Sequence, residues 1–142
     1  MNKVCVVYWS GTGNTEEMAE MVCDGVCESG GECSIVQVQD FFEELISEYD
    51  AFAFGCPSMG DECLEETEFE PVFSQIEEKL CGKRIALFGS YGWGMGEWMK
   101  KWEKRCLAAG AVLACESVIC ENEPDEQTSK ELKCMAKALL EK

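Results

Sequence analysis

The 142-residue sequence contains no histidine, only three prolines and far fewer cations than anions. Twelve Lys and Arg stand against 28 Asp and Glu, which gives a formal net charge of −16. This charge excludes a nucleic-acid-binding protein, because phosphates would repel it. No apolar run approaches the length of a membrane span, and the first apolar strand is too short for a signal peptide. We therefore expect a cytoplasmic protein that binds neither nucleic acid nor membrane.

Metal-ligating patterns are also missing, although the chain has 11 cysteines. No two of them have the C-x-x-C spacing that zinc and iron–sulfur sites commonly use. Their odd number argues against a disulfide framework. Most lie in apolar strand-like or helical patterns, where cysteine acts as a small hydrophobic residue. We predict no metal site, and the many free thiols indicate a reducing cytosol such as that of an anaerobe.

Apolar patterns predict alternating strands and helices in one domain over residues 1–142. The segment 51–56 is apolar on both faces, as in a parallel sheet that helices cover on both sides. This alternation predicts an α/β fold, a three-layer doubly wound five-stranded parallel sheet. Strands are expected at 4–9, 35–38, 51–56, 83–90 and 112–120, the last irregular near Glu116 and Ser117. Helices are expected after Thr15 and at 71–79, 96–109 and 127–140, with a short helical turn in 41–48.

The first strand runs into a polar loop, residues 10–15, that opens a helix. The helix N-terminus and the loop N–H groups point at one spot, which suits an anion, and glycines let the backbone approach it. The loop matches neither the Walker nor the dinucleotide pattern, so we predict a site for a single terminal phosphate. Neutral donors must bind it, because no Lys or Arg occurs between Val4 and Glu78. The alternative is an ordinary turn in which Asn14 or Thr15 caps the helix.

Two further loops, after the third and fourth strands, are expected at the same edge of the sheet. Met59 and Trp93 are large apolar side chains at their tips, and together they could form a slot for a flat aromatic ligand. The alternative is that Trp93 folds back onto the core. A phosphate cradle, a planar slot and loops without catalytic His, Lys or Arg together indicate flavin mononucleotide (FMN).

Four motifs strengthen this interpretation: Tyr-Trp-Ser-Gly-Thr-Gly-Asn-Thr-Glu at 8–16, Gly-Cys-Pro-Ser-Met-Gly-Asp-Glu at 55–62, Leu-Phe-Gly-Ser-Tyr-Gly-Trp-Gly at 87–94 and Asn-Glu-Pro-Asp-Glu at 122–126. With them, the chain resembles short-chain flavodoxins over essentially its whole length. Flavodoxins are the type example of the strand order 2-1-3-4-5, which the resemblance therefore implies. It also implies that FMN is bound by Ser10, Gly11, Thr12, Gly13, Asn14, Thr15, Pro57, Ser58, Met59, Gly60, Asp61, Glu62, Ser90, Tyr91, Gly92, Trp93, Gly94 and Asn122.

The resemblance assigns roles to these residues. Residues 10–15 and Ser90 would hold the phosphate. Trp93 would stack on one face of the flavin ring, and Met59 would lie against the inner face. Glu62 would accept a hydrogen bond from the ring N3–H, and Asn122 would lie near the ribityl chain or the ring edge. The peptide between Gly60 and Asp61 would turn its carbonyl toward N5 on reduction.

The implied function is electron transfer and not enzyme catalysis. A non-covalently bound FMN would carry single electrons at low potential between its semiquinone and hydroquinone forms, because carboxylates near the ring disfavour the anionic hydroquinone. The acidic monomer would dock weakly on redox enzymes with basic surfaces. Two alternatives stay open: an FMN-dependent NAD(P)H reductase of quinones or nitro compounds, and a phosphate-binding regulatory domain without a cofactor.

Overall fold

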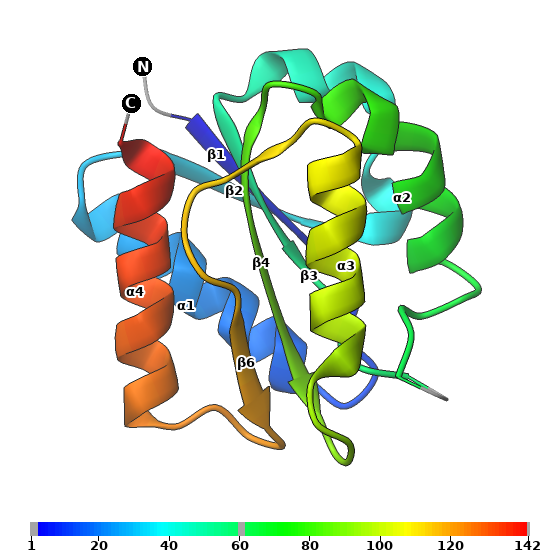
Figure 1. The fold of residues 1–142 in the computed structure, drawn as a ribbon. Coiled ribbons are helices and arrows are strands. Elements are labelled where there is room, and N and C mark those ends of the chain that lie inside the picture. Colours follow the sequence, from blue (N-terminus) through cyan, green and yellow to red (C-terminus); the bar gives the residue numbers. More distant parts are fainter. Residues whose placement is uncertain (1–2, 60–61, 142) are drawn as a thin grey trace.

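The computed structural model describes residues 3–59 and 62–141, and its centre is a parallel sheet (Figure 1). The strand order is β2-β1-β3-β4-β5, and β6 also pairs with β4, nearer the carboxyl end of β4 than β5 does. This confirms the predicted order. The strands are β1 (Lys3–Tyr8), β2 (Glu32–Gln37), β3 (Ala51–Gly55), β4 (Arg84–Tyr91), β5 (Val112–Leu113) and β6 (Val118–Glu121).

Helices cover both faces of the sheet (Figure 1). They are α1 (Asn14–Glu28), α2 (Phe69–Ile76), α3 (Glu97–Ala108) and α4 (Glu126–Leu140). Alternate residues of the strands enter two separate cores. Val6 and Ala53 pack with α1 and α4, while Val7 and Phe54 pack with α2 and α3. The three-layer doubly wound architecture is therefore confirmed, and no helix among the described residues is long and apolar enough to cross a membrane.

The predicted elements differ from the structure mainly in the second and fifth strands and in the helix predicted from Pro71; β2 begins at Glu32, three residues before the predicted start, and other ends differ by one or two residues. The fifth strand is divided into β5 and β6 around residues 114–117, where the sequence predicted an irregularity. Val38, predicted in the second strand, begins the 3₁₀ helix η1 (Val38–Asp40). The helix predicted from Pro71 begins at Phe69 and continues as the 3₁₀ helix η3 (Glu77–Leu80), with Pro71 in the first turn, where a missing N–H costs little. The predicted turn in 41–48 is the 3₁₀ helix η2 (Glu43–Glu48).

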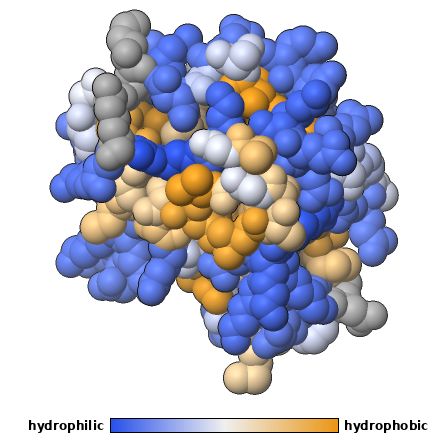
Figure 2. Space-filling model, turned by 45° about the horizontal axis from the view of Figure 1, so that its top comes forward, coloured by the Kyte–Doolittle hydropathy of each residue, from blue (hydrophilic) through white to orange (hydrophobic). Residues whose placement is uncertain are grey.

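An apolar patch lies at one end of the sheet (Figure 2). Figure 2 turns the upper end of Figure 1 forward and shows hydrophobic residues gathered in a patch within a hydrophilic surface. Near this end, Leu107 lies in the last turn of α3 and Val112 begins β5, and both are exposed. The loops after β1, β3 and β4 lie at the opposite, carboxyl end of the strands (Figure 1).

Candidate functional site

The three loops enclose a cavity of about 220 Å³ at the carboxyl ends of β1, β3 and β4. The chain crosses from one face of the sheet to the other beside β1, and such switch points are where doubly wound sheets bind ligands. The cavity is lined by Trp9, Ser10, Gly11, Thr12, Asn14, Thr15, Pro57, Ser58, Met59, Ser90, Tyr91, Gly92 and Asn122. The structure thus brings together most of the residues that the sequence predicted for the site. The described residues that line it carry no formal charge, so a bound anion would meet neutral donors.

The first loop leaves the N-terminus of α1 open to the cavity. The helix begins after Gly13, which has φ 100° and no side chain with which to cap the helix. Neither Asn14 nor Thr15 is the cap, so the side-chain cap that this alternative required is not formed. The Ser10 hydroxyl accepts a hydrogen bond from the Gly13 N–H at 3.0 Å, which closes the loop on itself. The first-turn N–H groups of α1 receive no side-chain cap and are suited to an anion.

Two buried hydroxyl groups join the first loop to the third. Thr15 Oγ1 and Ser90 Oγ lie 3.0 Å apart, and both residues are almost fully buried. Each hydroxyl has one proton, so when one donates to the other, the second proton remains for another acceptor. Both residues line the cavity, and that acceptor can be a ligand oxygen.

The second loop connects β3 to α2. Met59 and Cys63 exchange two backbone hydrogen bonds, of 2.8 and 2.9 Å. Ser58 N–H donates to the Ser90 carbonyl at 3.0 Å, which ties this loop to the third. The predicted roles of Gly60 and Asp61 fall outside the described residues.

The third loop places a large aromatic ring outside the core. Trp93 is 61 % exposed and Met95 is 85 % exposed, so the alternative in which Trp93 covers the core is wrong. Trp93 and Gly94 do not line the cavity, but they follow directly after Gly92, which does. We call the part of the second and third loops that adjoins the cavity its rim, and it includes the exposed apolar side chains of Met59 and Trp93.

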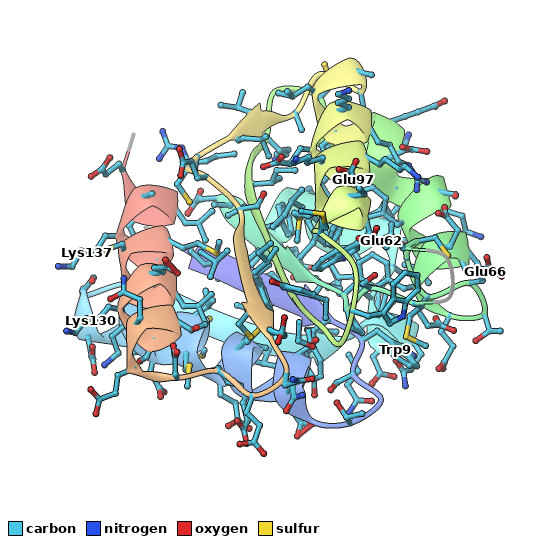
Figure 3. The ribbon with its side chains drawn as sticks, turned by 60° about the horizontal axis from the view of Figure 1, so that its bottom comes forward. Trp9, Glu62, Glu66, Glu97, Lys130 and Lys137 are labelled. Atoms are coloured by element: carbon cyan, nitrogen blue, oxygen red, sulfur yellow. The ribbon has the colours of Figure 1, made fainter. Side chains whose placement is uncertain are left out.

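Glu62 lies at the N-terminus of α3 (Figure 3). Its Oε1 accepts a hydrogen bond from the Glu97 N–H at 2.9 Å. A Cβ atom on Gly94 would stand 2.6 Å from its carboxyl carbon, so the carboxylate fills the space beside that glycine. This contact connects the second loop to the third, and it is one that the sequence did not predict.

Trp9 is a residue of the site that the sequence analysis did not single out. It lines the cavity beside Ser10, and its indole Nε1 donates to Glu68 Oε1 at 2.9 Å. The signal that could have found it is a large aromatic residue at the end of the first strand, directly before the polar loop.

Comparison with known proteins identifies the family. The model of the family described as "Flavodoxin" matches residues 6–135. A flavodoxin from Clostridium beijerinckii is 51% identical over 122 residues, 85% of this chain and 88% of that protein. A flavodoxin from Megasphaera elsdenii is 41% identical over 127 residues, 89% of this chain and 93% of that protein. The solution structure of the two-electron reduced Megasphaera elsdenii flavodoxin superimposes with a TM-score of 0.89 over 96% of this chain and 98% of that one, at 40% identity. The chain belongs to the flavodoxin family.

Proposed function

We propose that this chain carries single electrons at low potential with one FMN bound non-covalently in the cavity between the three loops. Flavodoxins are FMN-binding electron carriers, and the match along the chain supports the same activity here. The observation that carries the proposed position is the convergence of all three loops on one cavity with a polar floor. FMN supplies the redox chemistry when bound, and the protein supplies binding, orientation and electrostatics.

The floor of the cavity fits a phosphate. The first-turn N–H groups of α1, the hydroxyl of Thr12 and the buried pair Thr15 and Ser90 are neutral donors around one space. When one hydroxyl of this pair donates its hydrogen bond to the other, the second hydroxyl can still donate its proton to a ligand oxygen. In our proposal these groups hold the phosphate and orient the rest of FMN toward the rim.

The rim fits a flat ring. The cavity volume of about 220 Å³ is below the range of about 300–1,000 Å³ that encloses whole ligands, so the phosphate and sugar portions would fill it. The ring would then lie between Met59, which is 37 % exposed, and the exposed Trp93. This arrangement leaves the ring edge accessible, as electron transfer without a bound substrate requires.

Carboxylates near the rim would lower the potential. Glu62, Glu66 and Glu97 lie at the same end of the molecule (Figure 3). At an effective dielectric constant of about 20, two like charges about 8 Å apart repel by roughly 2 kcal/mol. Since 1 kcal/mol corresponds to roughly 43 mV for one electron, several such charges would make the added electron costly by about 100 mV after screening.

The acidic surface would also select the partners. The net charge of −16 favours redox enzymes with basic docking surfaces, reached by fast and salt-sensitive encounters. We propose a monomeric, cytoplasmic, single-domain carrier for this role. The alternative of an NAD(P)H reductase is not favoured, because the two relatives from Clostridium beijerinckii and Megasphaera elsdenii are flavodoxins.

An anaerobic titration with dithionite, followed by visible absorbance, tests the proposed function. We expect the FMN-loaded protein to take up two electrons in separated one-electron steps, with the second potential well below that of free FMN. NADPH alone should not bleach the bound FMN. A single two-electron step at the potential of free FMN would contradict the proposal, and so would rapid bleaching by NADPH.

A further inference from the structure

The indole ring of Trp9 is held by a carboxylate from a distant part of the chain. Trp9 Nε1 donates to Glu68 Oε1 at 2.9 Å, across a separation of 59 residues. Trp9 follows β1 and lines the cavity, while Glu68 directly precedes α2. This hydrogen bond therefore connects one wall of the cavity to the segment that follows the second loop.

The other side of the Trp9 ring supports the first loop. A Cβ atom on Gly11 would stand 3.0 Å from the indole Cη2, so the backbone of the loop runs directly against the ring. The backbone N–H of Trp9 donates to the Gly55 carbonyl at 3.0 Å, which fixes the base of the residue on β3. The direction in which the indole points therefore affects the position of the loop above it.

Glu68 is itself held in a rigid turn. The carboxylate of Glu65 is buried, and it accepts hydrogen bonds from the N–H groups of Thr67 at 2.8 Å, Glu68 at 2.7 Å and Phe69 at 2.8 Å. Burial opposes the ionisation of Glu65, but these donors and the Thr67 hydroxyl outweigh it and lower its pKa. The backbone of Glu68 is thus fixed, and its carboxylate is presented to Trp9 from a defined point.

We propose that Glu68 is a positioning residue for FMN binding, which acts by holding the Trp9 indole as a preformed wall of the cavity. The inference rests on the proposed function of the same site. Without an acceptor at position 68, the indole loses its one directional contact at Nε1, and its side chain and the first loop must be ordered when FMN binds. The carboxylate oxygen of Glu68 therefore contributes to FMN binding by holding the indole in place beforehand, and the negative charge of Glu68 is not needed for this.

Two variants separate the oxygen from the charge. Glu68→Gln and Glu68→Ala remove the same charge, but only glutamine keeps an oxygen acceptor. From the usual strength of one hydrogen bond, we expect Glu68→Ala to bind FMN about three- to tenfold more weakly than Glu68→Gln. Quenching of FMN fluorescence during titration of the FMN-free protein measures both dissociation constants. Glu78→Gln, at an exposed acidic residue in η3, is the matched control for loss of one negative charge.

The partner residue completes the test. Trp9→Phe keeps an aromatic ring without the N–H, and we expect Glu68→Ala to have no further effect in that background, as required of two residues that act through one contact.

The free energy of unfolding in denaturant, measured on the FMN-free variants, should be nearly the same for Glu68→Ala and Glu68→Gln. Equal FMN affinities of these two variants, with normal binding by the unaltered protein, would overturn this inference alone. A parallel loss of folding stability and affinity in Glu68→Ala would overturn it in favour of a purely structural role. Absence of FMN binding by the unaltered protein would overturn the proposed function as well.

Discussion

Thr15 Oγ1 and Ser90 Oγ lie 3.0 Å apart, although 75 residues separate them in the chain. One belongs to the first turn of α1, and the other lies near the end of β4. Because both are buried, removal of one hydroxyl leaves the other without its partner, and this is costly for a buried polar group. The pair therefore links the position of α1 to that of β4 at the floor of the cavity.

The first prediction concerns this pair. Thr15→Val keeps the shape of the side chain but removes its hydroxyl, so we expect FMN to bind about tenfold more weakly, equivalent to about 1.4 kcal/mol. Fluorescence titration of the FMN-free variant measures the change. Thr128→Val, at a buried threonine in the first turn of α4 that is not among the residues lining the cavity, is a control that should lower stability without a specific loss of affinity. Equal affinity losses in both variants would contradict the assignment.

The second prediction concerns Trp93. Its ring is exposed at the rim, where the proposed site requires stacking on the flavin. Trp93→Ala should weaken FMN binding by about 1 kcal/mol or more, because the stacked surface is lost. Met95→Ala, two residues away and still more exposed, should change affinity much less. If both substitutions have the same small effect, Trp93 does not contact the ring.

Gly94 provides a test of the contact between Glu62 and α3. Gly94 and Gly30 have similar positive φ values, 93° and 90°, but only at Gly94 would a Cβ atom meet another group, the carboxyl carbon of Glu62 at 2.6 Å. Both Gly94→Ala and Gly30→Ala should lose about 1 kcal/mol of stability from backbone strain. Only Gly94→Ala should also weaken FMN binding, because it displaces Glu62. Matched calorimetric titrations of the two variants would show whether the second effect exists.

Stability should depend on an ion pair between α2 and α3. The Arg105 guanidinium donates to both carboxylate oxygens of Glu70 at 2.7 Å, and these hydrogen bonds lower the pKa of Glu70 below its ordinary value of 4.5. A lowered pKa stabilises the folded state above pH 4.5, and this contribution disappears as the pH falls through the lower folded value. Glu70→Gln should thus lose about 1 kcal/mol at pH 7, after allowance for partial exposure, and progressively less as the pH falls below 4.5.

Urea unfolding at several pH values measures this difference. Glu28→Gln, which removes an exposed pair with Lys133, should change stability by less at every pH. A Glu70→Gln effect that persists undiminished at pH 3 would show that packing, and not ionisation, carries the contribution of this residue.

The cysteines should divide into two classes by reactivity. Burial raises the pKa of Cys5 and Cys106 to about 12 and that of Cys120 to about 11, so few thiolates form at neutral pH. Native-state alkylation with iodoacetamide, followed by peptide mass spectrometry, should modify the exposed thiols first and the buried ones only after unfolding. The exposed class is Cys27, Cys81 and Cys134, and the buried class is Cys5, Cys56, Cys106 and Cys120. Early modification of the buried class would contradict the described core.

The strands and the first loop could be predicted from the sequence because their signals are local. An apolar run that ends in Ser10, glycines and Asn14 specifies a strand, a turn and a helix start within a few residues. The irregularity predicted near Ser117 is also local, and the strand is divided there. The sequence placed Val38 in a strand, whereas it begins a 3₁₀ helix, because an isolated apolar residue at a strand end fits either structure.

The contacts between loops could not be predicted in the same way. Glu62 meets the N–H of Glu97 across 35 residues, and Trp9 meets Glu68 across 59. A glutamate in an acidic sequence has many possible partners, and only the folded chain selects one of them. The sequence therefore predicted which loops surround the site, while the structure was needed to show how their side chains are held.

The most direct test of this account is titration of the folded, FMN-free protein with FMN, followed by fluorescence and visible absorbance. We predict that FMN fluorescence is quenched until one equivalent has bound, and that the yellow colour remains with the protein through gel filtration. If a protein with native far-ultraviolet circular dichroism leaves the fluorescence unchanged and elutes colourless, the three loops do not form an FMN site.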